Sequence, residues 1–133
     1  MIILLIMPFK VTASVMIKVG GYILSYEDTV AWARRRYPGI DIYDENLIPY
    51  IAKRHNRKLG GEMTILSAYQ GGEVWCLFLM HYKDDPNAVR GSYEKFEEDE
   101  GCIRFKHNAF THQEDFEKAK FVTIVDPFTP REY

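Results

Sequence analysis

The chain has 133 residues, of which 47% are hydrophobic and 14% aromatic, and its formal net charge at pH 7 is −2. This length suits one domain with one hydrophobic core, and the apolar content excludes a chain that is largely disordered. A net charge so close to zero gives no sign of a strongly basic nucleic-acid binder. We expect a single domain over residues 1–133, with a polar tail at 129–133.

The first nine residues are apolar throughout. They are too few to span a bilayer, which takes about 20 apolar residues, and they lack the basic start of a signal peptide. We expect Ile2–Met7 to form a buried strand, with residues 1–15 as an N-terminal extension if the true start is Met16. Without a targeting or spanning segment, we expect a cytoplasmic protein that does not contact a membrane.

Residues 15–24 have the apolar content of a strand, interrupted by Gly20-Gly21. A glycine pair inside a strand indicates either a tight hairpin or a bulge where another backbone comes close. Ser25 is a favourable N-cap, and it predicts a helix over 26–37 with one apolar face. Pro38-Gly39 ends this helix because proline cannot continue it.

A second helix is predicted over about 46–58, where Leu47 and Ile51 recur with the helical period. Proline lacks a backbone N–H and is tolerated in the first helical turn, so Pro49 places the start of this helix near Asp44–Asn46. The glycine pair at 60–61 ends the helix, because glycine is the residue most often found just past a helix C-terminus.

Gly71-Gly72 predicts the turn of a β-hairpin, because both central residues of a type I′ turn have positive φ. With these two residues as the loop, Ser67 lies opposite Cys76. The second strand, Val74–Tyr82, is apolar on both sides and should lie in the middle of a sheet. Cys76 is therefore expected to be a buried, inert thiol that acts as a small hydrophobic residue.

The second half of the chain is less regular. Residues 83–101 are polar and rich in turn formers, and a loop this long tends to be functional or mobile. Ser92 predicts a short helix through residues 93–96. The acidic run that follows, Glu97–Glu100, is expected to be a solvated loop. A short strand is predicted at 102–105. A short helix at 112–120 and a strand at 121–125 are also predicted.

The order of these elements predicts an α+β fold in a single domain. We expect a mainly antiparallel sheet of four to six strands centred on Val74–Tyr82. The helices 26–37 and 46–58 should pack together on one face of this sheet.

Cys102, His107 and His112 have the side chains of a zinc site, with Glu114 and Asp115 close by. Their C-x4-H-x4-H spacing matches no common zinc motif, which usually has a closely spaced cysteine or histidine pair. We therefore expect surface histidines here, with no metal and no cofactor.

A catalytic site is the alternative for the end of the central strand, where His81, Tyr82, Asp84 and Asp85 follow one another. Carboxylates and histidines at a strand end are typical of general acid–base catalysis, although Asp-Asp-Pro-Asn is also ordinary turn chemistry. Cys76 and His81 are five residues apart on one strand, so they are expected to point to opposite faces and not to form a nucleophile–base pair.

A basic and aromatic surface is expected from Arg34, Arg35 and Tyr37 together with Arg54 and Arg57. These residues are candidates for binding a charged partner. We do not expect nucleic acid to be this partner, because the chain is acidic overall, with a pI near 6.1.

No acid, base and nucleophile converge in the sequence, which favours a small binding or protein–protein interaction module over an enzyme. We expect this module to form a homodimer or larger homo-oligomer through the apolar N-terminal strand, and it could also bind another protein. A small enzyme with its site at His81, Tyr82, Asp84 and Asp85 is the alternative.

Overall fold

The computed structural model describes residues 17–55, 64–85 and 93–125, apart from the side chains of residues 54 and 55. Within these residues the chain forms, in order, β1 (Ile17–Ser25), α2 (Tyr26–Arg36), α3 (Asp44–His55), β2 (Ile65–Gln70), β3 (Glu73–Asp84), α4 (Glu100–Ala109), α5 (Gln113–Lys118) and β4 (Lys120–Val125). The strands form one antiparallel sheet in the order β2-β3-β1-β4. The predicted α+β fold is confirmed.

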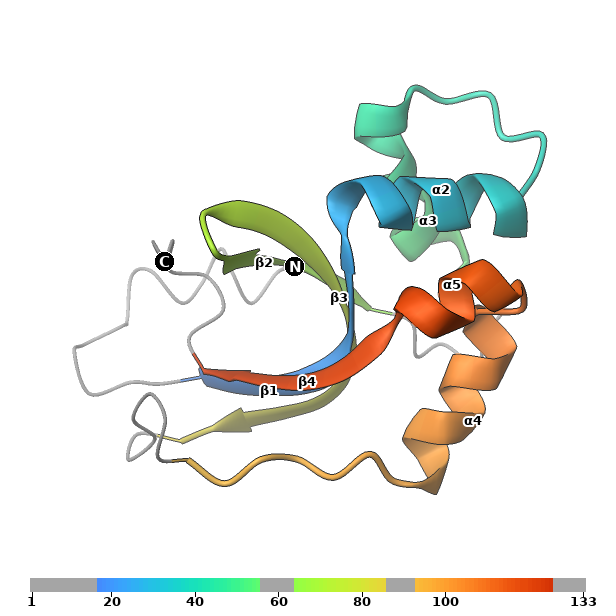
Figure 1. Ribbon diagram of the computed structural model, residues 1–133. Coiled ribbons are helices and arrows are strands. Elements are labelled where there is room, and N and C mark those ends of the chain that lie inside the picture. The colour runs from blue at the N-terminus through green and yellow to red at the C-terminus, as the bar shows by residue number, and fades with distance from the viewer. Residues whose placement is uncertain (1–16, 56–63, 86–92, 126–133) are drawn as a thin grey trace.

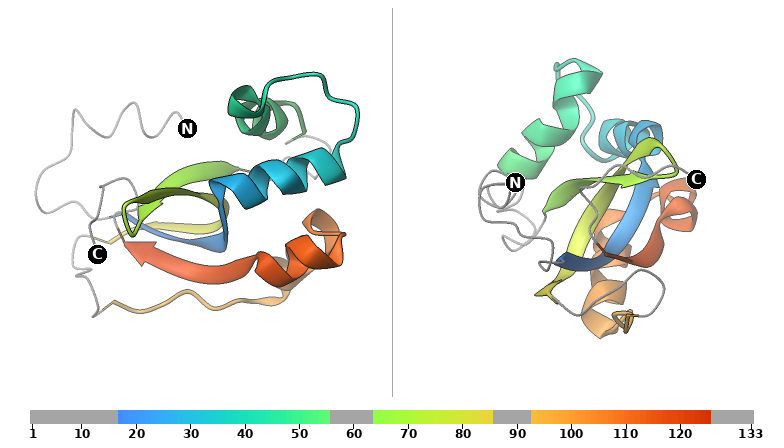
Figure 2. Two further views of the ribbon diagram at one scale, coloured as in Figure 1. Left: turned by 45° about the horizontal axis from the view of Figure 1, so that its top comes forward. Right: turned by 90° about the vertical axis from the view of Figure 1, so that its left-hand side faces the viewer.

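The helices gather at one end of a strongly curved sheet (Figures 1 and 2). The main core lies between them and the sheet. There Tyr22 of β1 and Phe78 of β3 pack with Trp32 of α2, Leu47 of α3 and Phe110, the residue after α4. The predicted helices α2 and α3 therefore pack on one face of the sheet, and α4 joins them there.

The β2–β3 hairpin has the predicted register, with Ser67 opposite Cys76. Gly71 and Gly72 have φ angles of 59° and 77°, the positive values that a type I′ turn needs. Cys76 is buried as expected, and burial raises the pKa of its thiol.

The glycine pair in β1 marks a bulge and not a hairpin. Gly20 lies opposite His81 while Gly21 lies opposite Leu79, so Met80 is an extra residue in β3. A Cβ atom added to Gly21 would lie 2.0 Å from the carbonyl oxygen of Phe78. The expected close approach of another backbone is therefore confirmed, and it needs glycine at this position.

The first helices follow their sequence signals. Ser25 caps α2, since its hydroxyl oxygen accepts a hydrogen bond from the Asp28 N–H. The α3 helix begins at Asp44, within the predicted range, but Pro49 does not lie in its first turn as expected. Pro49 is the sixth residue of this helix, one turn later than its usual place, and its missing N–H leaves the Glu45 carbonyl without its normal helical donor.

Two predictions for the second half are wrong. Residues 102–105 belong to helix α4 and not to a strand, and residues 93–96 form no helix. Asp99 caps α4, and its apolar residues Cys102, Phe105 and Ala109 recur with helical spacing on the face that packs into the core. Four residues of this segment were too few to distinguish a helical period from a strand. The predicted helix at 112–120 is present as α5, and the strand at 121–125 is present as β4.

The other face of the sheet carries a second buried apolar cluster, made of Ile17, Val19, Leu66, Ala68, Leu77 and Ile124. The segment Ile2–Met7 lies outside the described residues, as do the 1–15 extension and the 129–133 tail. Self-association through the N-terminal strand therefore stays a prediction. None of the helices in the described part of the chain has the length and apolar character needed to cross a membrane.

Candidate metal centre

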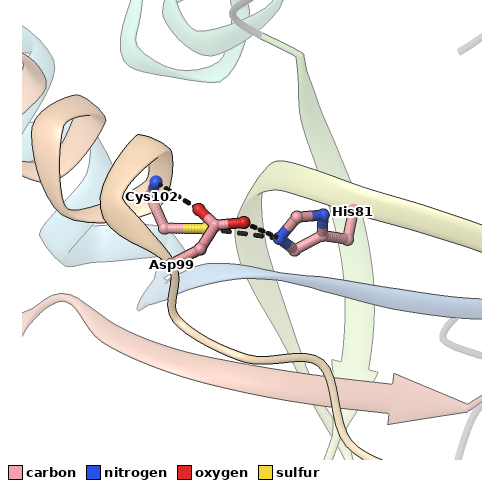
Figure 3. Close-up of side chains that lie close together, drawn as sticks. All are labelled: His81, Asp99 and Cys102. Carbon is pink, nitrogen blue, oxygen red and sulfur yellow. Dashed lines mark hydrogen bonds and ion pairs between the residues drawn. The ribbon is translucent and has the colours of Figure 1, made fainter.

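His81 of β3 meets Asp99 and Cys102 at the N-terminus of α4 (Figure 3). The His81 Nε2 atom lies 3.4 Å from the Cys102 Sγ atom and 3.3 Å from the Asp99 Oδ2 atom. All three ligand atoms lie within 4.8 Å of one another. Among the residues that the structure describes, no other three side chains of His, Cys, Asp or Glu come together in this way.

Asp99 is held in place because it is the N-cap of α4. Its Oδ1 atom accepts a hydrogen bond of 2.9 Å from the Cys102 backbone N–H, and its Oδ2 atom faces His81. Hydrogen bonds from Cys102 hold the pKa of the Asp99 carboxyl below its usual value. The carboxylate is thus ionised at neutral pH, and each of its oxygens has a separate contact.

Cys102 lies on the buried side of the cluster, with 2% of its surface exposed. Burial, together with the neighbouring Asp99 carboxylate, raises the pKa of the Cys102 thiol to about 11. The thiol is therefore protonated at neutral pH in the metal-free protein. A nucleophilic cysteine needs the opposite, a lowered pKa and an accessible sulfur.

The β3 bulge brings His81 to this cluster. Leu77 and Leu79 pack in the second apolar cluster, and without the extra residue Met80 the next alternate position, His81, would face the same way. The bulge turns His81 to the helix-covered face, where it lies with Cys76. The expectation that these two point to opposite faces is therefore wrong.

Aromatic packing fixes the orientation of the His81 ring. Phe96 stacks on it with the ring centroids 5.1 Å apart and the planes inclined by 23°. Phe121 packs against it in a T-shaped arrangement, with the ring centroids 6.5 Å apart. The Phe96 N–H donates to the Thr123 hydroxyl of β4. The segment before α4 is therefore fastened to the sheet beside His81.

The acidic segment before α4 is not simply a solvated loop. The Tyr22 hydroxyl, from the buried core, donates a hydrogen bond of 2.6 Å to the Glu98 Oε2 atom. Burial and this carboxylate raise the pKa of Tyr22. Lys18, itself buried, donates to the Glu94 carbonyl oxygen and lies over the Phe96 ring. These contacts anchor the segment that precedes Asp99 to strand β1.

The geometry suits metal binding better than covalent catalysis. In a Cys-His-Asp triad the two partners of histidine contact different ring nitrogens. Here Cys102 and Asp99 both face the Nε2 atom of His81. Three ligand atoms that converge on one point are the arrangement that a metal ion requires.

The other candidates at the end of β3 do not join this cluster. The Tyr82 hydroxyl lies 3.3 Å from the Asp84 Oδ1 atom at an exposed position, and the Asp85 Oδ2 atom lies 3.7 Å from the Lys18 Nζ atom. The predicted enzyme site therefore contributes His81 to the cluster, while Tyr82 and Asp84 contact each other instead.

The candidate binding arginines are engaged within the chain. Arg34 donates to Asp44 and to the backbone carbonyls of two residues in the loop before it, and Arg35 pairs with Asp115 and Glu114. Tyr37 packs edge-on against Trp32. The side chain of Arg54 and the whole of Arg57 lie outside the described residues. These contacts reduce the positive charge that this surface offers to a partner.

The trio that sequence spacing singled out for zinc is not brought together. Cys102 belongs to the cluster, but His107 packs against Phe116, with the ring centroids 4.9 Å apart, and the exposed His112 precedes α5. Comparison of the chain with protein-family models, with curated proteins and with solved structures finds no match. The geometry is therefore the basis for assigning a function.

Proposed function

We propose that this protein is a metal-binding domain, in which His81, Asp99 and Cys102 hold a zinc-type divalent cation. The observation that carries the proposal is the distance of the His81 Nε2 atom from each of the two other ligand atoms. Tetrahedral zinc with usual bond lengths separates a nitrogen from a sulfur ligand by about 3.5 Å and a nitrogen from an oxygen ligand by about 3.4 Å. The Nε2–Sγ and Nε2–Oδ2 distances of 3.4 and 3.3 Å agree with these values.

The ligand types favour zinc over the hard cations. Calcium and magnesium take oxygen ligands, whereas a thiolate and an imidazole suit zinc and its neighbours in the transition series. Cation binding would deprotonate the Cys102 thiol, because the thiolate is the form that coordinates. This is a binding function, the class that the sequence favoured, but the sequence indicated a protein-interaction module with no metal.

The site is supported before any ion arrives. Asp99 is fixed by its hydrogen bond as the N-cap of α4, Cys102 by its buried position in the first turn of this helix, and His81 by stacking on Phe96. A site with fixed ligands loses less conformational entropy on binding, which supports a high affinity.

Cobalt(II) titration of the chelator-treated full chain tests this proposal. We expect one equivalent of cobalt to bind, with the near-ultraviolet charge-transfer band of a thiolate–cobalt bond. Cys102→Ser should remove the band. His81→Gln should weaken binding by more than the roughly 10- to 100-fold that loss of a supporting outer residue costs.

Matched controls separate the site from general damage. Cys76→Ala removes the other cysteine of the chain, and His112→Gln changes an exposed histidine outside the cluster. Both variants should keep the band and the affinity of the parent protein. A folded parent protein that gives no thiolate–cobalt band, or a band that survives Cys102→Ser, would refute the proposal.

Asp99 offers a separate prediction, because its two roles can be divided. Asparagine is as good an N-cap as aspartate but carries no charge, so Asp99→Asn should keep the stability of the metal-free protein while weakening metal binding. Asp99→Ala should lose both, with a lower free energy of unfolding than the parent and Asp99→Asn. Denaturant unfolding and metal titration of the two variants measure this difference. Equal metal affinity in parent and Asp99→Asn would show that Asp99 is a cap and not a ligand.

A further inference from the structure

We infer that the metal ion at His81, Asp99 and Cys102 keeps one exchangeable coordination position that faces solvent and binds small monodentate anions. This inference rests on the proposed metal-binding function. It distinguishes an open centre, which can act on a ligand, from a closed centre that only supports the fold.

The number of ligands gives the first argument. Zinc sites are usually four-coordinate, and the described residues supply three ligand atoms. A carboxylate can fill a further position when both its oxygens bind the metal. Asp99 is restrained from doing so, because its Oδ1 atom accepts the Cys102 N–H and closes the first turn of α4. As far as the described residues go, one position is then left for a ligand from solution.

The distribution of burial gives the second argument. The Cys102 sulfur lies at the bottom of the cluster, whereas 31% of the His81 side chain and 50% of the Asp99 side chain are exposed. An ion bound to all three would therefore have protein on its sulfur side and solvent on the side of His81 and Asp99. The remaining position of a tetrahedron points away from the three ligands, toward this solvent side.

Charge gives the third argument and the class of ligand. The thiolate of Cys102 and the carboxylate of Asp99 would cancel the two positive charges of the ion. The cluster also lies at the N-terminus of a ten-residue helix, whose dipole favours negative charge. The neutral centre beside this dipole accepts one small anion more readily than a cation. If the ion is bound, it would polarise an oxygen donor at this position, which is the requirement for Lewis-acid catalysis.

Azide is a suitable probe, because it is a small monodentate anion. The full chain is loaded with cobalt(II), and its visible absorption is followed as azide is added. We expect a saturable change in the visible bands while the thiolate–cobalt band remains. X-ray absorption of the zinc-loaded protein should show one sulfur and three lighter ligands, one of which is replaced when azide is added.

The outcomes separate this inference from the proposed function. A cobalt-loaded protein whose spectrum does not respond to azide has a closed centre, with its fourth ligand drawn from the residues outside the described ranges or from a second chain. Two sulfurs per metal ion would likewise overturn the inference, since the sulfurs would then come from two chains or from both cysteines. If cobalt does not bind at all, the proposed function itself fails. Glu97→Gln, a change at an exposed carboxylate before the cluster, should respond to azide as the parent does.

Discussion

Gly21→Ala is expected to lower the free energy of unfolding by more than about 3 kcal/mol, or to prevent folding altogether. The added Cβ atom would lie 2.0 Å from the carbonyl oxygen of Phe78 and 2.9 Å from its carbonyl carbon. Both are backbone atoms of the central strand β3, which pairs with β1 and β2, so they cannot move away without breaking the sheet. Denaturant unfolding followed by circular dichroism measures the loss.

Gly20→Ala is the matched control for Gly21→Ala, because the two glycines are adjacent and neither has a positive φ angle. Its Cβ atom would meet the ring of Phe96, at 2.7 Å from the nearest carbon. A side chain can turn aside where a backbone cannot, so the expected cost is below about 2 kcal/mol. Displacing Phe96 also removes the ring that stacks on His81, and metal affinity should fall. Equal stabilities of the two variants would contradict the bulge geometry.

The sequence predicts local structure well at positions where a residue type is compatible with only one local conformation. Gly71-Gly72 predicts a type I′ turn, and the turn fixes the pairing of Ser67 with Cys76. Ser25 predicts the start of α2 because its hydroxyl accepts a backbone N–H. Gly20-Gly21 is harder, because the same pair suits a hairpin or a bulge, and only the neighbouring strands decide between them.

The candidate centre could not be predicted from strand periodicity. A single extra residue, Met80, reverses the faces of every later position in β3, and no local pattern announces it. His81 then meets Cys102, which lies 21 positions later in the chain. One signal was available. Asp99 precedes Cys102 by three residues, the spacing of an N-cap and the N–H that it accepts, and this pattern predicts a helix start. The pattern is ambiguous because Asp99 lies in an acidic run, and an acidic run is also typical of a solvated loop.

Arg35→Met is expected to lower the free energy of unfolding by about 3 kcal/mol, because it leaves a buried carboxylate without its partner. Asp115 of α5 is only 1% exposed, and its two oxygens accept hydrogen bonds from the Nε and one terminal nitrogen of Arg35 in α2. Methionine keeps much of the aliphatic stem of arginine and so preserves the packing. The loss of unfolding free energy therefore measures the effect of removing the charge of Arg35 and its hydrogen bonds. Denaturant unfolding at neutral pH measures it.

Lys118→Met is the matched control, because Lys118 also links α5 to α2 through an ion pair with Asp28, 3.2 Å long and exposed on both sides. An exposed pair contributes at most about 1 kcal/mol, so this variant should remain close to the parent. The double variant Arg35→Met with Asp115→Leu removes the charge together with its partner, and it should recover much of the stability that Arg35→Met loses. If Arg35→Met costs no more than Lys118→Met, the Asp115 carboxylate is not buried in solution. In that case α5, which has only six residues, is not held against α2 by this pair.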